Sequence, residues 1–128
     1  INDSKATSFE STKYALQNNK NIFWILGGLP KKHDRIRLGK LKNNIYKAYI
    51  IGKHSSFFKK QLKNKVEFIN FSTLKQALNN IFLDLKNCSS SSTVLLSPSS
   101  ASYDQYKNFE ERGNQFKNLV KIYARKHF

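Results

Sequence analysis

The chain has 128 residues and a mass of 14.9 kDa, which is the size of one domain. Hydrophobic residues make up 39% of it and aromatic residues 13%, so it is not intrinsically disordered, and no apolar run approaches the roughly 20 residues of a membrane span. The net charge is +15, but 19 of the 23 basic residues are lysines scattered along the chain, which does not by itself indicate a nucleic-acid interface.

Four short apolar runs, rich in β-branched and aromatic residues, predict strands. They are residues 21–26, 45–52, 66–68 and 93–96. The first and the last are apolar without alternation, which is typical of strands buried on both faces of a parallel sheet. We expect residues 1–3 to be the end of one further strand that comes before them.

Helical periodicity predicts α-helices between these strands. Residues 72–86 are the best example, because six apolar side chains recur at the spacing of one helix face after Ser72, the expected N-cap. Residues 7–17 begin with Thr7-x-x-Glu10, which has the spacing of a capping box. A weaker helical turn follows His54. A final helix carries an apolar stripe made of Phe109, Phe116, Val120 and Tyr123.

Strands and helices are therefore expected to alternate along residues 1–128, with a helix after every strand. That order predicts one α/β domain, a mainly parallel sheet with helices on both faces. In such sheets, ligands bind beyond the carboxyl ends of the strands. Three loops leave predicted strands at that edge: residues 2–7, 27–34 and 97–102.

The three loops together offer hydroxyls, helix N-terminal amides, a Gly27-Gly28 pair and lysines, a set that suits a carboxylate or a phosphate. Each feature also has a purely structural interpretation. Thr7 and Ser102 are good N-caps, and the glycine pair lacks the remainder of a P-loop. From the residues alone, we expect an anion-binding α/β domain.

Cysteine and histidine usage limits the redox and metal chemistry of the chain. Cys88 is the single cysteine, so an internal disulfide is excluded, and a reducing, cytoplasmic setting is the simplest interpretation. His33, His54 and His127 lack the spacing of metal ligands. We therefore expect no metal site in this chain.

The same three loops carry a resemblance to a known family. The motifs are Asn-Asp-Ser-Lys-Ala-Thr at residues 2–7, Leu-Gly-Gly-x-x-Lys at residues 26–31, and Leu-Leu-Ser-Pro-x-x-Ala-Ser-x-Asp-Gln-x-Lys-Asn-Phe-Glu-x-Arg-Gly-x-x-Phe at residues 95–116. They resemble the C-terminal domain of the Mur ligases, in particular the members that add D-glutamate. The resemblance extends over essentially the whole chain, although residues 43–87 match in element order more than in identity.

The resemblance implies a Rossmann-like domain, the third of a three-domain, ADP-forming ligase of peptidoglycan precursor synthesis. With ATP and Mg²⁺, the family phosphorylates the alanyl carboxylate of UDP-N-acetylmuramoyl-L-alanine, and the amine of D-glutamate then attacks the acyl phosphate. The P-loop and the Mg²⁺ ligands belong to the two earlier domains, so the isolated domain is expected to be inactive. Because the chain starts at Ile1 and contains no methionine, we expect residues upstream of it. We also expect a cytoplasmic monomer without nucleic-acid or membrane partners.

Residue roles follow from position within the motifs. Asp3 matches the residue that contacts the ATP ribose, and Lys5 matches a lysine that faces the reaction centre. Four groups match those that hold the two D-glutamate carboxylates in the family: Thr7, Lys31, Ser102 and the backbone of Phe109. Tyr103 matches the residue beside Ser102. Lys32 could share or take the role of Lys31, because Leu29-Pro30, just before Lys31, lies in a stretch that varies in the family.

Two other functions stay open as alternatives. One is a non-catalytic domain of the same fold, and the other is a nucleic-acid-binding basic α/β domain. The second requires an arginine-rich or aromatic-interleaved stripe, and the sequence has four arginines in total.

Overall fold

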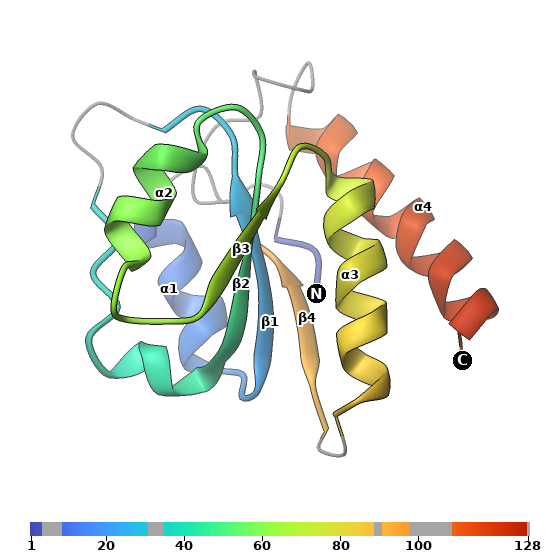
Figure 1. The fold of residues 1–128 in the computed structure, drawn as a ribbon, viewed down its shortest axis with the longest axis horizontal. Coiled ribbons are helices and arrows are strands. Elements are labelled where there is room, and N and C mark those ends of the chain that lie inside the picture. Colours follow the sequence, from blue (N-terminus) through green and yellow to red (C-terminus); the bar gives the residue numbers. More distant parts are fainter. Residues whose placement is uncertain (4–8, 31–34, 89–90, 98–108, 128) are drawn as a thin grey trace.

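Four parallel strands form a sheet at the centre of the molecule (Figure 1). The structure is a computed structural model that describes residues 1–3, 9–30, 35–88, 91–97 and 109–127. The strands are β1 (Ile22–Gly27), β2 (Ile45–Ile51), β3 (Phe68–Phe71) and β4 (Thr93–Leu96). Their order in the sheet is β3-β2-β1-β4, and Asn2 adds an isolated parallel bridge to Leu96 beyond β4. Residues 1–3 therefore lie where the end of a further strand was expected.

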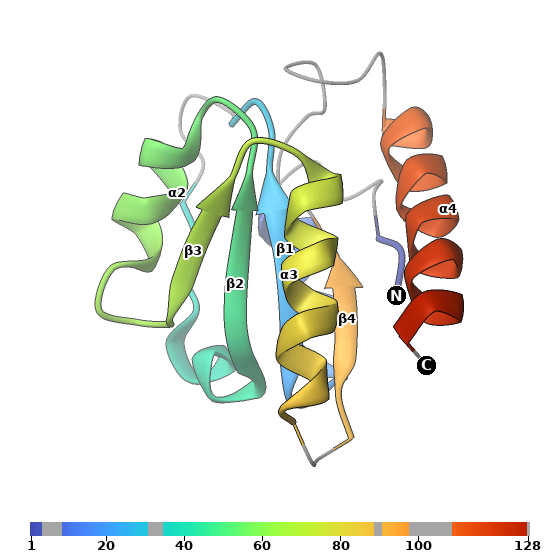
Figure 2. The same cartoon turned by 45° about the vertical axis from the view of Figure 1, so that its right-hand side comes forward.

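Helices cover both faces of this sheet (Figures 1 and 2). Helices α1 (Phe9–Gln17) and α2 (Ser55–Leu62) pack on one face, and α3 (Leu74–Lys86) and α4 (Phe109–His127) pack on the other. The prediction of an α/β domain with helices on both faces is confirmed. Within the described residues, every helix is too short or too polar to span a bilayer.

The alternation of side chains along β1 explains why this strand is apolar throughout. Ile22, Trp24 and Leu26 enter the core under α1 and α2, while Phe23 and Ile25 enter the core under α3 and α4. All five side chains are fully buried. Burying a large apolar side chain contributes roughly 1.5–3 kcal/mol, so β1 stabilises both halves of the molecule at once.

The helix predicted from residues 72–86 is correct in extent, but its N-cap is Thr73 rather than Ser72. The hydroxyl of Thr73 accepts a hydrogen bond from the backbone N–H of Gln76, and the side chain of Gln76 accepts one from the backbone N–H of Thr73. This reciprocal capping box needs a spacing of three residues from the cap. Gln76 lies three residues after Thr73, so Thr73 is the N-cap, one residue later than predicted.

Two further expectations are corrected by the structure. The strand expected at residues 66–68 is β3, which begins only at Phe68 because Val66 still donates its N–H to the carbonyl of Leu62 in α2. The expected α-helix between β1 and β2 is also wrong for the described part of that connection. It contains residues 35–38, which have no regular secondary structure, followed by the 3-10 helix η1 (Gly39–Asn44).

The helices at the two ends of the chain are described in part. Helix α1 is present from Phe9, whereas the predicted Thr7–Glu10 capping box includes a residue outside the described part of the chain. In α4, Phe116 and Val120 belong to the apolar core as the predicted stripe requires. The side chains of Phe109 and Tyr123 lie outside the described part.

Candidate functional site

The carboxyl ends of β1, β4 and residues 1–3 meet at one edge of the sheet (Figure 2). The N–H of Asp3 donates to the carbonyl of Leu96 at 2.6 Å, and the N–H of Ser97 donates to the carbonyl of Ile25 at 3.2 Å. These bonds join the first residues of the loops that were predicted to share this edge. The convergence of the strand ends is therefore confirmed, at the place where open α/β sheets bind ligands.

Asp3 is held at this edge by a buried pair of hydroxyls. The Oγ of Ser97 donates to the Oδ2 of Asp3 at 2.6 Å and lies 3.0 Å from the Oγ1 of Thr12. Both oxygens lie within hydrogen-bonding distance of the single Ser97 hydroxyl, and the contact with Asp3 is the shorter of the two. Ser97 and Thr12 are fully buried, and Asp3 is half-buried. The carboxylate thus has a fixed donor on its inner side.

A surface cavity of about 420 Å³ opens beside Asp3. Residues 1–3 form one wall, and α1 forms the other through Ser11, Tyr14 and Ala15. Tyr14 is 76% exposed there. Asp3 is one of the residues that line this cavity, so a small molecule bound there would lie beside it.

Gly27 is required by the packing of the sheet itself. Its φ is +140°, a conformation that side-chain-bearing residues rarely adopt, and an added Cβ would overlap the carbonyl oxygen of Ile51 in β2. We expected the Gly27-Gly28 pair to allow close approach of the backbone to a ligand. At Gly27, the group that approaches closely is the neighbouring strand.

Helix α4 is tied to the same edge by two hydrogen bonds. Arg112 is 1% exposed, and its Nη1 donates to the carbonyl of Gly27 at 3.5 Å. The side-chain amide of Asn2 donates to the carbonyl of Gly113 at 3.4 Å. The helix is therefore anchored to the end of β1 and to residues 1–3, the two elements that lead into the predicted ligand loops.

Of the residues predicted to form the site, the structure describes Asp3 and the backbone of Phe109. Phe109 is the first described residue of α4, and its backbone lies in that helix. The other predicted site residues lie outside the described part of the chain: Lys5, Thr7, Lys31, Ser102 and Tyr103. The alternative Lys32 lies outside it as well.

Sequence reasoning missed Ser97, Thr12 and Arg112. Arg112 lies four residues before Phe116, on the apolar face of α4, and an arginine at a core position of a helix is a signal that could have identified it. Ser97 belongs to the motif at residues 95–116, but the motif assigned it no role, and neither Ser97 nor Thr12 carries a local signal of its contact. Their partners are more than 80 residues away along the chain.

A second polar cluster lies on the face of the sheet that α3 covers. The hydroxyl of Tyr49 in β2 donates to the Oδ2 of Asp84 in α3 at 2.6 Å, and the Nζ of Lys47 lies 3.3 Å from the same oxygen. Burial, followed by the hydrogen bond and the charge of Asp84, raises the pKa of Tyr49 well above its ordinary value. Tyr49 is therefore a neutral donor that ties α3 to the sheet.

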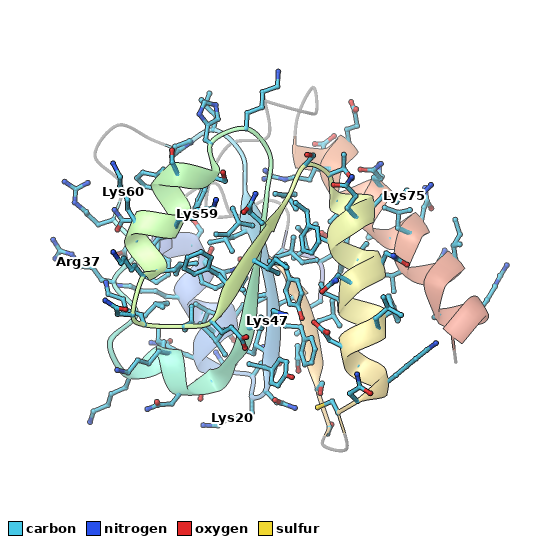
Figure 3. All side chains as sticks on the ribbon, viewed as in Figure 1. Lys20, Arg37, Lys47, Lys59, Lys60 and Lys75 are labelled. Atoms are coloured by element: carbon cyan, nitrogen blue, oxygen red, sulfur yellow. The ribbon has the colours of Figure 1, made fainter. Side chains whose placement is uncertain are left out.

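The basic side chains labelled in Figure 3 come from several parts of the fold. Lys59 and Lys60 belong to α2, Lys75 to α3 and Lys47 to β2, while Arg37 lies in the segment before η1. Within the described residues, no group of three or more histidine, cysteine, aspartate and glutamate side chains could hold a metal ion.

Comparison with known proteins gives a consistent result. No protein-family model matches the chain. It is similar to UDP-N-acetylmuramoylalanine–D-glutamate ligases, with 41% identity over 116 residues to that of the Wolbachia of Brugia malayi, which is 91% of this chain and 23% of that protein. The ligase of Rickettsia felis is 39% identical over 121 residues (94% and 27%), and that of Phenylobacterium zucineum is 36% identical over 124 residues (97% and 26%). The chain spans about a quarter of the length of these curated relatives.

Proposed function

This chain is homologous to one domain of the UDP-N-acetylmuramoylalanine–D-glutamate ligases, and from that relationship we propose that it is their C-terminal, D-glutamate-binding domain. The observation that carries the proposal is similarity over more than nine-tenths of the chain, combined with a carboxyl edge at which Asp3 is fixed beside a cavity. The whole enzyme is proposed to join D-glutamate to UDP-N-acetylmuramoyl-L-alanine in the cytoplasm, as a monomer.

The residues at the sheet edge fit the nucleotide in one respect. The Asp3 carboxylate is held by Ser97 on one side and lines a cavity, so it can accept hydrogen bonds from ribose hydroxyls. When bound, ATP supplies the phosphoryl group that activates the alanyl carboxylate, with Mg²⁺ neutralising the phosphate charge. We assign the Mg²⁺ ligands to other domains of the ligase, as the family resemblance implies.

D-Glutamate carries two carboxylates, which need two separate groups of donors. We assign Lys31 with Thr7 to one, and Ser102 with the backbone at Phe109 to the other, with Tyr103 beside Ser102. The anchoring of α4 to the end of β1 by Arg112 supports this assignment, because it ties together the two elements from which these donors extend. A charge-assisted hydrogen bond contributes roughly twice as much as a neutral one, so the lysine is expected to dominate.

The amine of D-glutamate is then the nucleophile of the proposed reaction. It attacks the carbonyl carbon of the alanyl acyl phosphate, the new C–N bond forms, and the C–O bond to phosphate breaks as inorganic phosphate leaves with the electron pair. The amine loses a proton in this step. Lys5 is assigned to the reaction centre, where a cation stabilises the negative charge of the phosphate.

A steady-state assay of the full-length ligase that carries this domain tests the proposal. ADP release should require both UDP-N-acetylmuramoyl-L-alanine and D-glutamate, and L-glutamate should replace D-glutamate poorly. The isolated 128-residue chain should release no ADP from ATP. Equal rates with D-glutamate and with a diamino acid such as meso-diaminopimelate would contradict the assignment.

A further inference from the structure

We propose that Ser97, supported by Thr12, is a positioning residue that holds the Asp3 carboxylate in place for the nucleotide. The inference rests on the proposed function, since it takes Asp3 as the group that contacts the ribose. Ser97 would act through Asp3 and without touching the substrate. The inference rests on two contacts: the 2.6 Å hydrogen bond from the Oγ of Ser97 to the Oδ2 of Asp3, and the 3.0 Å distance between the Oγ of Ser97 and the Oγ1 of Thr12.

The position of the Ser97 hydroxyl is fixed by the backbone of Ser97 and does not depend on Asp3. The N–H of Ser97 donates to the carbonyl of Ile25 at 3.2 Å, and its carbonyl accepts from the Nε1 of Trp24 at 2.8 Å. Both partners belong to β1, and the Trp24 side chain is fully buried. Replacing Ser97 by alanine should therefore remove the hydroxyl and leave the backbone in place.

Asp3 is held at two points, and one of its oxygens stays available. Its N–H donates to the carbonyl of Leu96 at 2.6 Å, which fixes the backbone, and its Oδ2 accepts from Ser97, which fixes the rotation of the carboxylate. Among the residues that the structure describes, Oδ1 has no donor. Because Asp3 also lines the cavity, Oδ1 is the oxygen that can accept from a ligand.

Thr12 also contacts the Ser97 hydroxyl. The Oγ of Ser97 lies 3.0 Å from the Oγ1 of Thr12, and this contact helps to hold the serine side chain in the rotamer that reaches Asp3. Thr12 is fully buried in α1, and the order Thr12, Ser97, Asp3 joins that helix to the end of β4 and to residues 1–3. A fixed donor lowers the cost of orienting the carboxylate when the nucleotide binds.

The test is a double-mutant cycle in the full-length ligase, with KM for ATP and KM for D-glutamate measured separately. Ser97→Ala should raise KM for ATP by roughly tenfold or more, the value of one hydrogen bond to a charged group. Both kcat and KM for D-glutamate should stay within about twofold. A substitution that weakens ATP binding equally in the ground state and in the transition state raises KM for ATP and leaves kcat unchanged. In an Asp3→Ala background, the same substitution should cause no further rise.

A second pair of variants keeps the test valid if Ser97→Ala does not fold. Thr12→Val removes the hydroxyl at nearly constant shape, and Thr12→Ser keeps it. Thr12→Val should raise KM for ATP, and Thr12→Ser should restore most of the wild-type value. A role in folding alone would lower the Tm of both Ser97→Ala and Thr12→Val without separating KM for ATP from KM for D-glutamate.

The outcomes distinguish this inference from the proposed function. If Asp3→Ala raises KM for ATP and Ser97→Ala does not, the positioning role is overturned while the ligase assignment stands. An equal effect of Ser97→Ala with and without Asp3 also overturns it, because Ser97 would then act by another route. If the unmutated ligase does not require D-glutamate for ADP release, the proposed function itself fails.

Discussion

Arg112 in α4 donates a hydrogen bond to the carbonyl of Gly27, the last residue of β1, across the face of the sheet that α4 covers. The guanidinium is 1% exposed, which is rare for an arginine and requires that its donors be satisfied inside the protein. Two elements that lead into the proposed D-glutamate loops are thereby joined through one side chain.

The first prediction concerns the stability that Arg112 provides. Arg112→Ala should lower the free energy of unfolding of the chain by about 2–3 kcal/mol, because it removes buried packing and leaves the Gly27 carbonyl without this donor. Arg125→Ala is the matched control, since Arg125 is exposed on the same helix and should change stability by no more than about 0.5 kcal/mol. Urea unfolding measures both, and equal effects would refute a specific role for Arg112.

The second prediction separates steric overlap from backbone strain at two glycines. Gly27→Ala should prevent folding or destabilise the chain by well over 3 kcal/mol, because the new Cβ meets the Ile51 carbonyl in addition to an unfavourable φ. Gly39→Ala has an unfavourable φ of +52° but open space around it, so it should cost only about 1–2 kcal/mol. Circular dichroism and thermal unfolding of both variants provide the comparison. Similar Tm values for the two would show that the overlap is relieved cheaply.

The third prediction uses the raised pKa of Tyr49, which comes from burial and then from Asp84. Tyr49→Phe should lower stability at neutral pH by about 1–2 kcal/mol, because Asp84 loses a donor. A tyrosine whose pKa is raised on folding stabilises the protein fully below its ordinary pKa of about 10, and this contribution is lost as the pH rises further. The advantage of the wild type over Tyr49→Phe should therefore shrink above about pH 10.

Tyr46→Phe provides the control for that experiment. Tyr46 is 45% exposed and stacks on Phe23 with ring centroids 4.5 Å apart, a contact that phenylalanine preserves. Its stability should differ little from the wild type at neutral pH. A wild-type advantage over Tyr49→Phe that stays constant up to pH 11.5 would contradict the coupling between Tyr49 and Asp84.

The fourth prediction tests the proposed D-glutamate donors in the full-length ligase. Lys31→Ala should raise KM for D-glutamate by roughly tenfold or more, and Ser102→Ala by less, since a charge-assisted hydrogen bond contributes about 1.5–3 kcal/mol and a neutral one about 0.5–1.5 kcal/mol. KM for the muramoyl nucleotide should change little. Lys32→Ala is the matched control on the neighbouring residue. If Lys32→Ala abolishes D-glutamate dependence and Lys31→Ala does not, the motif assignment is shifted by one residue.

Much of the fold was predictable because burial leaves a clear pattern in the sequence. The β1 sequence is apolar at consecutive residues because Trp24 and Phe23 are buried on opposite faces of the sheet. That pattern distinguishes β1 from a strand with one solvent-exposed face. Element ends were less predictable. The start of β3 depends on a hydrogen bond from Val66 back to α2, and the cap of α3 depends on which of two adjacent hydroxyls is paired with Gln76.

The candidate site was predictable only where a motif was available. Asp3 was assigned a role by resemblance. Ser97 also lies in a motif, but its contact with Asp3 was not predicted, because that contact joins distant parts of the chain. Ser97 and Asp3 are 94 residues apart in sequence, and Arg112 and Gly27 are 85 apart. No local period or spacing encodes such pairs, since tertiary packing alone brings them together.

The parallel bridge between Asn2 and Leu96 has a consequence for the order of folding. It closes a loop that contains most of the chain, and the entropic cost of closing such a loop is met only after the intervening strands have paired. The Asp3 carboxylate therefore reaches its final environment late, when β4 has docked beside β1. A nascent chain that has not yet emerged beyond residue 97 should lack the nucleotide-facing edge, even where earlier strands have already paired. The ability to bind the nucleotide would therefore appear only when folding is complete.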